Sequence, residues 1–325
     1  MTTRTTPTAI PTTTGPAPHA VEVRDLTTAD AGCAVADAVS FDVEEGEIFA
    51  ILDPDSARTS QTVECIAGLR VPDTGTVRVF GYDPVTDRTR VRSLLGVQLH
   101  EGRLQDERTV REIVDTHGRR HPEPLDSGEL LERLGLDRIA GTHYGNLSRG
   151  QRRRVSLAVA LVGRPRVVVL DAPTTGLDPQ SRRQIWSLVS DLRDSGVTVL
   201  LVTPLMDEAE RLADRVALID RGRLVAVDTP RGLVASAGLQ QQVRFSTKAD
   251  LHQDWIRRLT EVSNVARDGD QFVVTGDDRM LFSVVALLAA HDIVPARLEV
   301  DQPTLDDAFA ALTGRRPTTH DGATR

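Results

Sequence analysis

The sequence predicts an α/β protein with a mostly parallel sheet, followed by a smaller α+β unit. Strand-like and helix-like segments alternate from residue 47 to residue 228, which is the pattern of a parallel sheet covered by helices. Several of the strand segments are continuous apolar runs, such as Val167–Leu170, and such runs are typical of strands buried on both faces. The alternation of strands and helices ends at Thr229-Pro230, which indicates that a second unit begins there.

The expected strands of the first part are short segments rich in β-branched or alternating apolar residues. They are Val21–Leu26, Ala38–Val43, Glu47–Leu52, Thr76–Phe80, Leu94–Leu99, Arg166–Leu170, Thr198–Val202, Arg215–Asp220 and Leu224–Asp228. Helical spacing of apolar residues predicts helices after residue 60 and over Leu147–Val162, Gln180–Arg193 and Met206–Ala213. Residues 106–146 have helical patterns and no strand signal, so an inserted helical subdomain is expected at about 103–163. The early strands are expected to form an antiparallel β subdomain.

The main domain is therefore expected at residues 19–228, with a linker at 229–240 and a second domain at 241–315. Within the second domain the pattern reads β-α-β-β-α-β, which is typical of a ferredoxin-like unit. Its elements are expected at Gln242–Ser246, Leu251–Val262, Asn264–Arg267, Gln271–Thr275, Arg279–His291 and Pro295–Val300, before a last helix at Leu305–Leu312. Residues 1–18, which are rich in Thr and Pro, and the polar residues 316–325 are expected to be disordered tails.

Composition excludes several classes of function. The net charge of −8 argues against a nucleic-acid-binding protein, because such proteins need a basic field for phosphate contacts. Two cysteines are too few for a disulfide framework and predict a reducing compartment. The sequence has no apolar window of about 18 residues and no apolar signal-peptide core. We therefore expect a cytoplasmic protein that reaches a membrane only through a partner.

The stretch Glu47–Leu69 reads as a strand, a tight loop and a helix. This layout places the loop against a helix N-terminus, where backbone N–H groups and the helix dipole favour anions. A phosphate-binding loop would have the pattern G-x-x-x-x-G-K-[ST] here. The chain instead has DPDSARTS over residues 53–60. The strand-loop-helix order of a phosphate-binding loop is therefore present, but its glycines and lysine are not.

Two further motifs identify a family. The first is LSRGQ at residues 147–151, and the second is VVVLDAPTTGLDP at residues 167–179. With Ile66–Gly75, Met206–Asp214 and Pro303–Gly314, they resemble the nucleotide-binding subunits of ABC transporters, and most of all those of daunorubicin-type drug-resistance exporters. The resemblance covers about Val21–Arg315. It implies a P-loop NTPase-type cassette that uses ATP and Mg²⁺, docks on a membrane-spanning permease, and dimerises head to tail with a second cassette.

The resemblance places most of the family's working positions on unsuitable residues. The three phosphate-loop glycines fall at Asp53, Ser56 and Arg58, and the lysine falls at Thr59. The nucleotide-binding candidates are therefore Asp53, Ser56, Arg58, Thr59, Ser60 and Gln61. The remaining losses are in the general-base glutamate, the switch histidine, the Q-loop glutamine and the adenine-stacking aromatic, which fall at Ala172, Pro204, His100 and the segment Ala29–Ala31. Bulk and carboxylates in place of glycine amides and an ammonium group predict weak or absent ATP binding.

Other positions keep the family's residues. Ser60 and Asp171, which would hold Mg²⁺, remain, although each also has a structural interpretation, as a helix start and as a strand end. The signature positions Leu147, Ser148, Arg149, Gly150 and Gln151 remain, with Arg149 in place of a glycine. The D-loop Asp178 also remains. We interpret the basic run Arg152–Arg154 as a solvated helix face.

The sequence therefore predicts a degenerate pseudo-ATPase subunit of an exporter that completes a partner's site through LSRGQ. A heterodimer is favoured and a homodimer is the alternative, with the permease docked near His100–Val110 and the chain on the inner face of the membrane. Two other hypotheses stay open at this point: an ordinary ATP-hydrolysing exporter subunit, and a regulatory cassette protein outside transport.

Overall fold

The computed structural model describes residues 19–30, 33–53, 59–99, 104–247, 249, 251–277 and 279–315. Its centre is a six-stranded sheet in the order β5-β6-β7-β3-β8-β9, in which only β9 runs antiparallel to its neighbour. The strands are β3 (Ile48–Leu52), β5 (Leu95–Gln98), β6 (Val167–Asp171), β7 (Thr198–Thr203), β8 (Arg215–Asp220) and β9 (Arg223–Asp228). Every residue of β3, β6 and β7 is buried, which confirms the mostly parallel α/β sheet.

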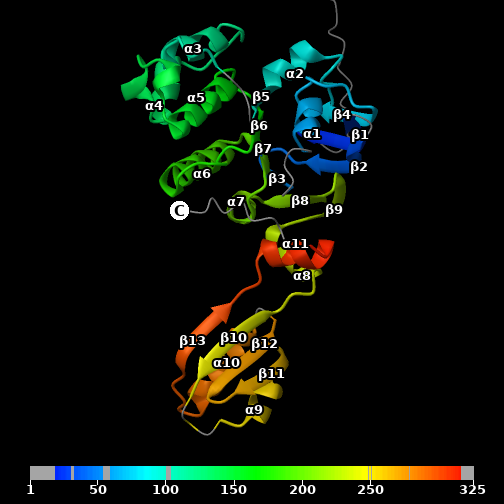
Figure 1. Cartoon of the computed structure of the whole chain (residues 1–325), viewed down its shortest axis with the longest axis vertical. Helices are drawn as coiled ribbons and strands as arrows, with labels where there is room; N and C mark the ends of the chain where they lie inside the picture. The colour runs from blue at the N-terminus through cyan, green and yellow to red at the C-terminus, as the bar shows by residue number, and fades with distance from the viewer. Residues whose placement is uncertain are drawn as a thin grey trace, which may run out of the picture.

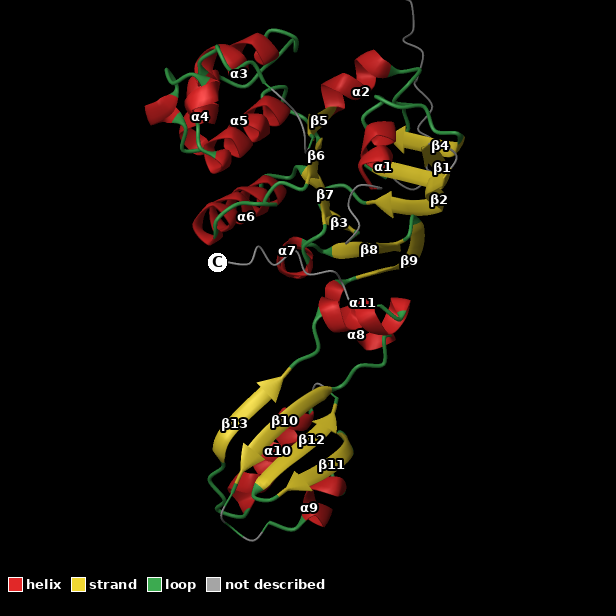
Figure 2. Cartoon of the chain, in the orientation of Figure 1, coloured by secondary structure: helices red, strands yellow, loops and turns green. Residues whose placement is uncertain are grey.

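An antiparallel sheet in the order β2-β1-β4 lies beside the central sheet (Figures 1 and 2). It consists of β1 (Val21–Asp30), β2 (Cys33–Val43) and β4 (Thr74–Val79). Its apolar face packs with α1 (Thr59–Ile66) in a single core cluster that also includes Phe49 and Val169 of the central sheet. A short helix that was not expected, α2 (Arg88–Leu94), leads into β5. This sheet confirms the expected antiparallel β subdomain.

The segment between β5 and β6 is helical, as expected. It contains α3 (Val110–Gly118), α4 (Ser127–Arg133), α5 (Arg149–Leu161) and two single turns of 3₁₀ helix at Asp137–Ile139 and Tyr144–Asn146. Apolar residues of α3, α4 and α5 share one core cluster with β3, β6 and β7 and with two further helices, α6 (Pro179–Asp194) and α7 (Met206–Leu212). The helical block is thereby packed onto the central sheet.

The C-terminal unit has the β-α-β-β-α-β order and a four-stranded antiparallel sheet ordered β11-β12-β10-β13, which confirms the ferredoxin-like expectation. Its elements are β10 (Gln241–Ser246), α9 (Gln253–Arg257), β11 (Val262–Asp268), β12 (Gln271–Gly276), α10 (Met280–Ala290) and β13 (Ala296–Asp301). The expected helix Leu251–Val262 is wrong in length. It ends early because Val262 already pairs with Gly276 in the sheet.

Two helices connect this unit to the main domain (Figure 1). The expected linker contains α8 (Pro230–Ser236), which begins with Thr229 as N-cap and Pro230 in its first turn. The last helix, α11 (Leu305–Thr313), packs on α7 and α8, and Leu305 and Phe309 are part of the main domain's core cluster. The domain boundaries themselves stay a prediction. Within the described residues, no helix is both long enough and apolar enough to cross a membrane.

Candidate nucleotide site and partner-facing surface

The carboxyl ends of three neighbouring strands bring the predicted site residues to one edge of the central sheet. Leu52 of β3 lies opposite Thr203 of β7, and Asp171 of β6 lies opposite Val202. Just beyond these pairs, the Asp53 N–H donates to the Thr203 carbonyl over 3.3 Å, and the Ala172 N–H donates to the Val202 carbonyl over 2.8 Å. Parallel strands place Asp53, Asp171, Ala172 and Pro204 together here although they lie far apart in sequence.

Asp53 and Thr59 form a buried pair at this edge. Their exposed fractions are 2% and 3%, and the Thr59 hydroxyl donates a hydrogen bond to the Asp53 carboxylate. Thr59 is the first residue of α1, so the pair closes the two ends of the loop where a phosphate would bind. The loop between them, residues 54–58, which includes Ser56 and Arg58, lies outside the described residues.

Neither of these two residues is a glycine or a lysine, the residues with which a phosphate loop holds a nucleoside triphosphate. A phosphate loop needs amide donors and an ammonium group directed at the anion. Here a carboxylate occupies the place of the first glycine, and the hydroxyl at the lysine position is engaged by that carboxylate. A carboxylate at this position would repel a phosphate, whereas the amide of a glycine loop would attract it.

Ser60 and Asp171, the two positions at which the resemblance implies magnesium ligands, differ in their surroundings. Ser60 is partly exposed in the first turn of α1, whereas Asp171 is 4% exposed at the end of β6. The Gln98 amide donates to the main-chain carbonyls of Asp171 (3.2 Å) and Leu99 (2.9 Å) and so fixes the strand ends next to each other. Gln61 has a buried side-chain oxygen that accepts no hydrogen bond from the described residues. His100 lies outside the part of the chain that the structure describes.

The general-base and switch positions supply no proton-transfer group. Ala172 is buried and has a φ of +47°, a left-handed conformation that costs a non-glycine residue about 1–2 kcal/mol. A methyl group can accept no proton. Pro204 follows β7 directly and has neither an imidazole nor a backbone N–H. Of the segment expected to stack on adenine, Ala31 is outside the described residues and Ala29 is exposed.

Sequence reasoning missed a buried carboxyl group next to this edge. Glu208 of α7 is fully buried and accepts hydrogen bonds from the Thr174 hydroxyl (2.7 Å) and the Trp186 indole (3.0 Å). Burial raises the pKa of Glu208, and these two hydrogen bonds oppose that shift. Glu208 thus joins α7 to the segment after β6 and to α6. The sequence does contain one sign that Glu208 is buried, because it lies one helical turn before the buried Leu212 on the apolar face of α7.

The signature residues begin α5 and form its capping box. The Ser148 hydroxyl accepts from the Gln151 N–H (3.2 Å), and the Gln151 side chain accepts from the Ser148 N–H (2.9 Å). Ser148 and Arg149 are exposed, Gly150 and Gln151 are partly exposed, and Leu147 is buried. The capping role leaves one face of the Ser148 hydroxyl at the protein surface.

The signature and the D-loop are in direct contact. A Cβ added at Gly150 would lie 2.8 Å from the Ser181 hydroxyl, so a larger residue would have to displace the Ser181 side chain. The Arg149 guanidinium donates to the Gly176 carbonyl over 3.4 Å. Asp178 caps α6 and accepts from the Ser181 hydroxyl over 2.6 Å, a bond that lowers the pKa of Asp178. Ser148–Gln151 with Asp178 are the residues that the resemblance directs at a partner cassette, and we call them the partner-facing surface.

The interpretation of Arg152–Arg154 as a solvated face is wrong, because all three side chains are partly buried and burial lowers the pKa of Arg153. Arg152 donates to the main-chain carbonyls of Gly145 (2.6 Å) and Leu147 (3.1 Å), and Arg154 donates to those of Leu134 (3.2 Å) and Gly135 (3.3 Å). Both side chains are partly buried. They hold the turns that precede α5, because a guanidinium group offers several donors to otherwise unpaired carbonyls.

Comparisons with known proteins agree with this geometry. Residues 36–175 match the family model described as ABC transporter. The chain is 34% identical over 310 residues to the daunorubicin/doxorubicin resistance ATP-binding protein DrrA of Streptomyces peucetius, covering 91% of this chain and 93% of the relative. It is 40% identical over 292 residues to the Nod factor export ATP-binding protein I of Paraburkholderia xenovorans, covering 86% and 92%.

The fold also matches solved structures. A structure of an ATP-binding subunit of an ABC transporter superposes with a TM-score of 0.61 at 25% identity, covering 67% of this chain and 93% of that one. A dimeric post-hydrolysis cassette bound to ADP and phosphate gives a TM-score of 0.58 at 23% identity, covering 64% and 98%, and this match supports the fold alone. The chain therefore belongs to the ATP-binding cassette family of ABC transporters.

Proposed function

We propose that this chain is the cassette subunit of a membrane exporter and that it neither hydrolyses ATP nor binds it tightly by itself. The observation that carries the proposal is the buried Asp53–Thr59 pair, which places a carboxylate where the family's phosphate loop has a glycine and engages the residue at the lysine position. Ala172 and Pro204 add the loss of the general base and the switch histidine. Such a general base is typically worth about 10²–10⁴ in rate.

The proposed role is to complete the active site of a second, competent cassette. The partner-facing surface is intact, while the residues that would serve the chain's own nucleotide are replaced. A heterodimer is thus favoured over a homodimer, because two copies of this chain would form two incomplete sites. The exporter assignment draws on relatives named for daunorubicin/doxorubicin resistance, linearmycin resistance and Nod factor export. In such a complex the chain would lie on the cytoplasmic face of the membrane, held by the permease.

The second candidate function is that of an ordinary ATP-driven subunit. Ser60 and Asp171 remain at the edge of the sheet, and the relatives are named as ATP-binding proteins. In that case, the purified chain would bind Mg-ATP with micromolar affinity and hydrolyse it through Asp171. The regulatory alternative predicts a gene without a neighbouring membrane subunit or a second cassette.

The deciding experiment measures Mg-ATP binding by calorimetry and phosphate release, with the purified chain alone and with its co-expressed second cassette. The expected result is no turnover by the chain alone and turnover by the pair. An Asp171→Ala variant of the chain is the control, and it should leave the turnover of the pair unchanged. Turnover by the chain alone that disappears in Asp171→Ala would overturn the proposal in favour of the ordinary subunit.

A further inference from the structure

A histidine and two carboxylates lie together at the start of the antiparallel β subdomain, in residues that neither the candidate nucleotide site nor the partner-facing surface uses. His19 lies two residues before β1, Asp42 lies in β2, and Glu44 follows β2 directly. Each side chain offers one ligand atom, and the imidazole nitrogen and the two carboxylate oxygens lie within 4.8 Å of one another. We call these three residues the His19 cluster.

The pairing of β1 with β2 explains why the three residues meet (Figure 1). Val21 lies opposite Val43, and the Ala20 N–H donates to the Val43 carbonyl over 2.8 Å. The chain before β1 therefore runs beside the chain that leaves β2. Asp42 and Glu44 are two residues apart, and in an extended chain such residues turn their side chains to the same face. The cluster thus follows from the strand register.

The imidazole nitrogen of His19 is placed as a ligand atom. His19 Nδ1 is buried and has no hydrogen-bond partner among the described residues. Glu44 Oε1 lies 3.1 Å from it, but not in the direction that a hydrogen bond requires. A tetrahedral Zn²⁺ ion bound to both atoms would hold them about 3.3–3.5 Å apart, because its bonds to nitrogen and oxygen ligands are about 2.0–2.2 Å long. The observed separation is therefore close to that of two ligands of one ion.

The Asp42 carboxylate is held in place by an arginine. Arg24 donates to Asp42 Oδ1 over 2.8 Å and pairs with Glu22 over 2.9 Å. One oxygen of Asp42 is thereby fixed, and the other is left for a ligand. Metal-ligating carboxylates are commonly hydrogen-bonded in this way, which sets their orientation. The other arginine that reaches Asp42, Arg215, donates to its main-chain carbonyl over 3.2 Å and pairs with Glu47 over 3.1 Å.

The cluster also lies in an excess of negative charge. Glu22 is directly opposite Asp42 in the ladder, and like charges in such a pair are destabilising. Within the described part of the chain, Arg24 is the one arginine that pairs with any of the carboxylates of Glu22, Asp42 and Glu44. Two negative charges therefore remain when the His19 imidazole is neutral. A bound divalent cation would balance them.

We propose that His19, Asp42 and Glu44 bind a divalent transition-metal ion, with Zn²⁺ as the best match. One imidazole with two carboxylates suits Zn²⁺, whereas Mg²⁺ prefers oxygen ligands alone. Three protein ligands leave a fourth position for water. The side chains of His19 and Glu44 are 34% and 57% exposed, so an ion can enter from solvent. The ion would connect the start of β1 to the turn between β2 and β3, and this inference does not depend on the proposed function.

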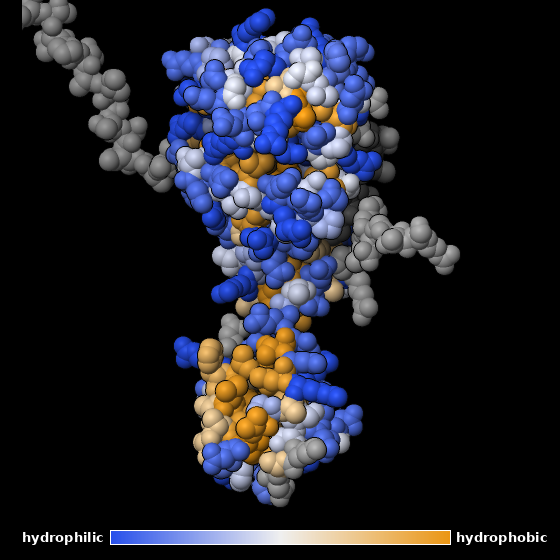
Figure 3. Space-filling model, turned by 90° about the vertical axis from the view of Figure 1, so that its left-hand side faces the viewer, coloured by the Kyte–Doolittle hydropathy of each residue, from blue (hydrophilic) through white to orange (hydrophobic). Residues whose placement is uncertain are grey.

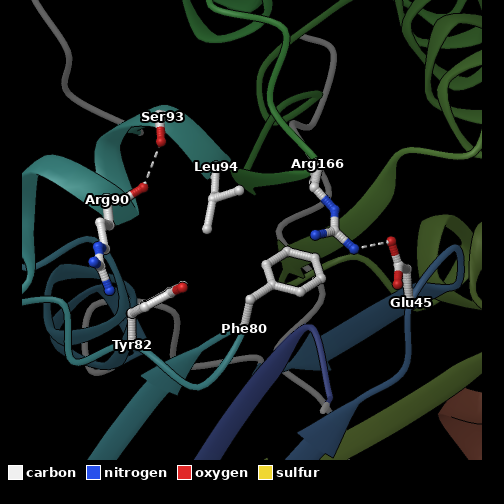
Figure 4. A pocket seen from close by; sticks show the side chains of 7 residues that line it. All are labelled: Glu45, Phe80, Tyr82, Arg90, Ser93, Leu94 and Arg166. Carbon is white, nitrogen blue, oxygen red and sulfur yellow. Dashed lines mark hydrogen bonds and ion pairs between the residues drawn. The ribbon is translucent and has the colours of Figure 1, made fainter. Parts of the chain in front are cut away.

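The test titrates the full chain with Zn²⁺ and, separately, with Mg²⁺ by calorimetry in a buffer free of chelators. The variants are His19→Ala, Glu44→Gln and Glu45→Gln. The last is the matched control, since Glu45 follows Glu44 in the chain but pairs with Arg166 over 2.5 Å (Figure 4). We expect the wild type and Glu45→Gln to bind a single Zn²⁺ at micromolar concentration. His19→Ala and Glu44→Gln should bind it at least about tenfold more weakly, the loss that even an outer-shell partner can produce.

Four other results would overturn the inference. Equal zinc binding by His19→Ala and the wild type would place the ion elsewhere in the chain. No zinc binding at micromolar concentration would leave His19 and Glu44 as an ion pair only. Binding of Mg²⁺ as tight as that of Zn²⁺ would indicate an unspecific group of carboxylates. Light scattering that rises with zinc would indicate association between molecules. Association is checked because the C-terminal unit exposes apolar residues, among them Phe282 at 77% and Val294 at 87% (Figure 3). Melting temperatures of the metal-free variants show that they are folded.

Discussion

The buried Asp53–Thr59 pair leads to a quantitative prediction about ATP affinity. Changing Thr59 to lysine alone should gain little, because the new ammonium group would pair with the Asp53 carboxylate that Thr59 now contacts. Changing both residues, in Asp53→Gly with Thr59→Lys, removes the repelling charge and leaves the ammonium group available to a phosphate. The two substitutions should therefore be strongly non-additive, as expected for residues in direct contact.

The magnitude follows from two terms. A carboxylate about 8 Å from a phosphate charge costs about 2 kcal/mol at an effective dielectric constant of about 20. A charge-assisted hydrogen bond from the lysine contributes about 1.5–3 kcal/mol. The double variant should therefore bind ATP about 300-fold to 5,000-fold more tightly than the wild type, whereas Thr59→Lys alone should gain less than about tenfold. Under the proposed function, neither variant should hydrolyse ATP, because Ala172 and Pro204 are unchanged.

Isothermal titration calorimetry measures the Mg-ATP affinity of four proteins. They are the wild type, Asp53→Gly, Thr59→Lys and the double variant. A variant with glycine at positions 53, 56 and 58 and lysine at position 59 is the positive control. Melting temperatures check that removing the buried carboxylate leaves the fold intact. The reasoning is refuted if the wild type binds Mg-ATP at micromolar concentration, or if Thr59→Lys alone gains as much as the double variant.

Three further predictions follow from other contacts. Ser148→Arg, on the partner-facing surface, should reduce the ATP turnover of the partnered complex by at least about tenfold while the chain still binds its partner in pull-down assays; unchanged turnover would contradict the heterodimer. Glu208→Gln should flatten the dependence of the melting temperature on pH. The raised pKa of Glu208 gives stability that is fully present below its unfolded value of about 4.3 and is lost as the pH rises through the folded value, and a glutamine has no such titration. Phe309→Ala should destabilise the chain to thermal unfolding by about 3–5 kcal/mol, because Phe309 is 2% exposed in the main core, whereas Phe282→Ala at a 77% exposed position should change stability by less than about 0.5 kcal/mol.

Much of the fold could be predicted because strand burial leaves a clear pattern in the sequence. The runs at β3, β6 and β7 are apolar throughout, and the structure buries every residue of them. The α2 helix could not be found in this way, because Val91 is its single buried residue and no apolar period marks it. The α8 helix could have been predicted, because Thr229 followed by Pro230 is a typical helix start. The linker expected from the sequence instead begins at these residues.

The candidate site was predicted in its positions and less well in its contacts. The motifs place Asp53, Asp171, Ala172 and Pro204, and strand pairing brings them together. The hydrogen bond from Thr59 to Asp53 could not be predicted. It depends on the path of the chain between the two residues, and the number of residues between them does not determine that path. The helix pattern could have shown that Glu208 is buried, but its hydrogen-bond donors lie 22 and 34 residues away, so no local pattern predicts them.

The site positions of the cassette fall into two groups. One group would contact the chain's own nucleotide, and the other would contact a nucleotide held by a second cassette. Under the proposed function, the positions that would serve the chain's own nucleotide carry other residues than the family's glycine, lysine, glutamate and histidine, and the Thr59 hydroxyl donates to the Asp53 carboxylate. Most of the residues that would face a partner are retained and in contact with the segment after β6, since Gly150 lies against Ser181 and Arg149, which replaces a glycine, donates to the Gly176 carbonyl. Uniform decay of a gene would damage both sets alike. The one-sided loss instead matches a subunit that still presents a signature to another cassette's nucleotide, which is why the activity of the pair is the decisive measurement.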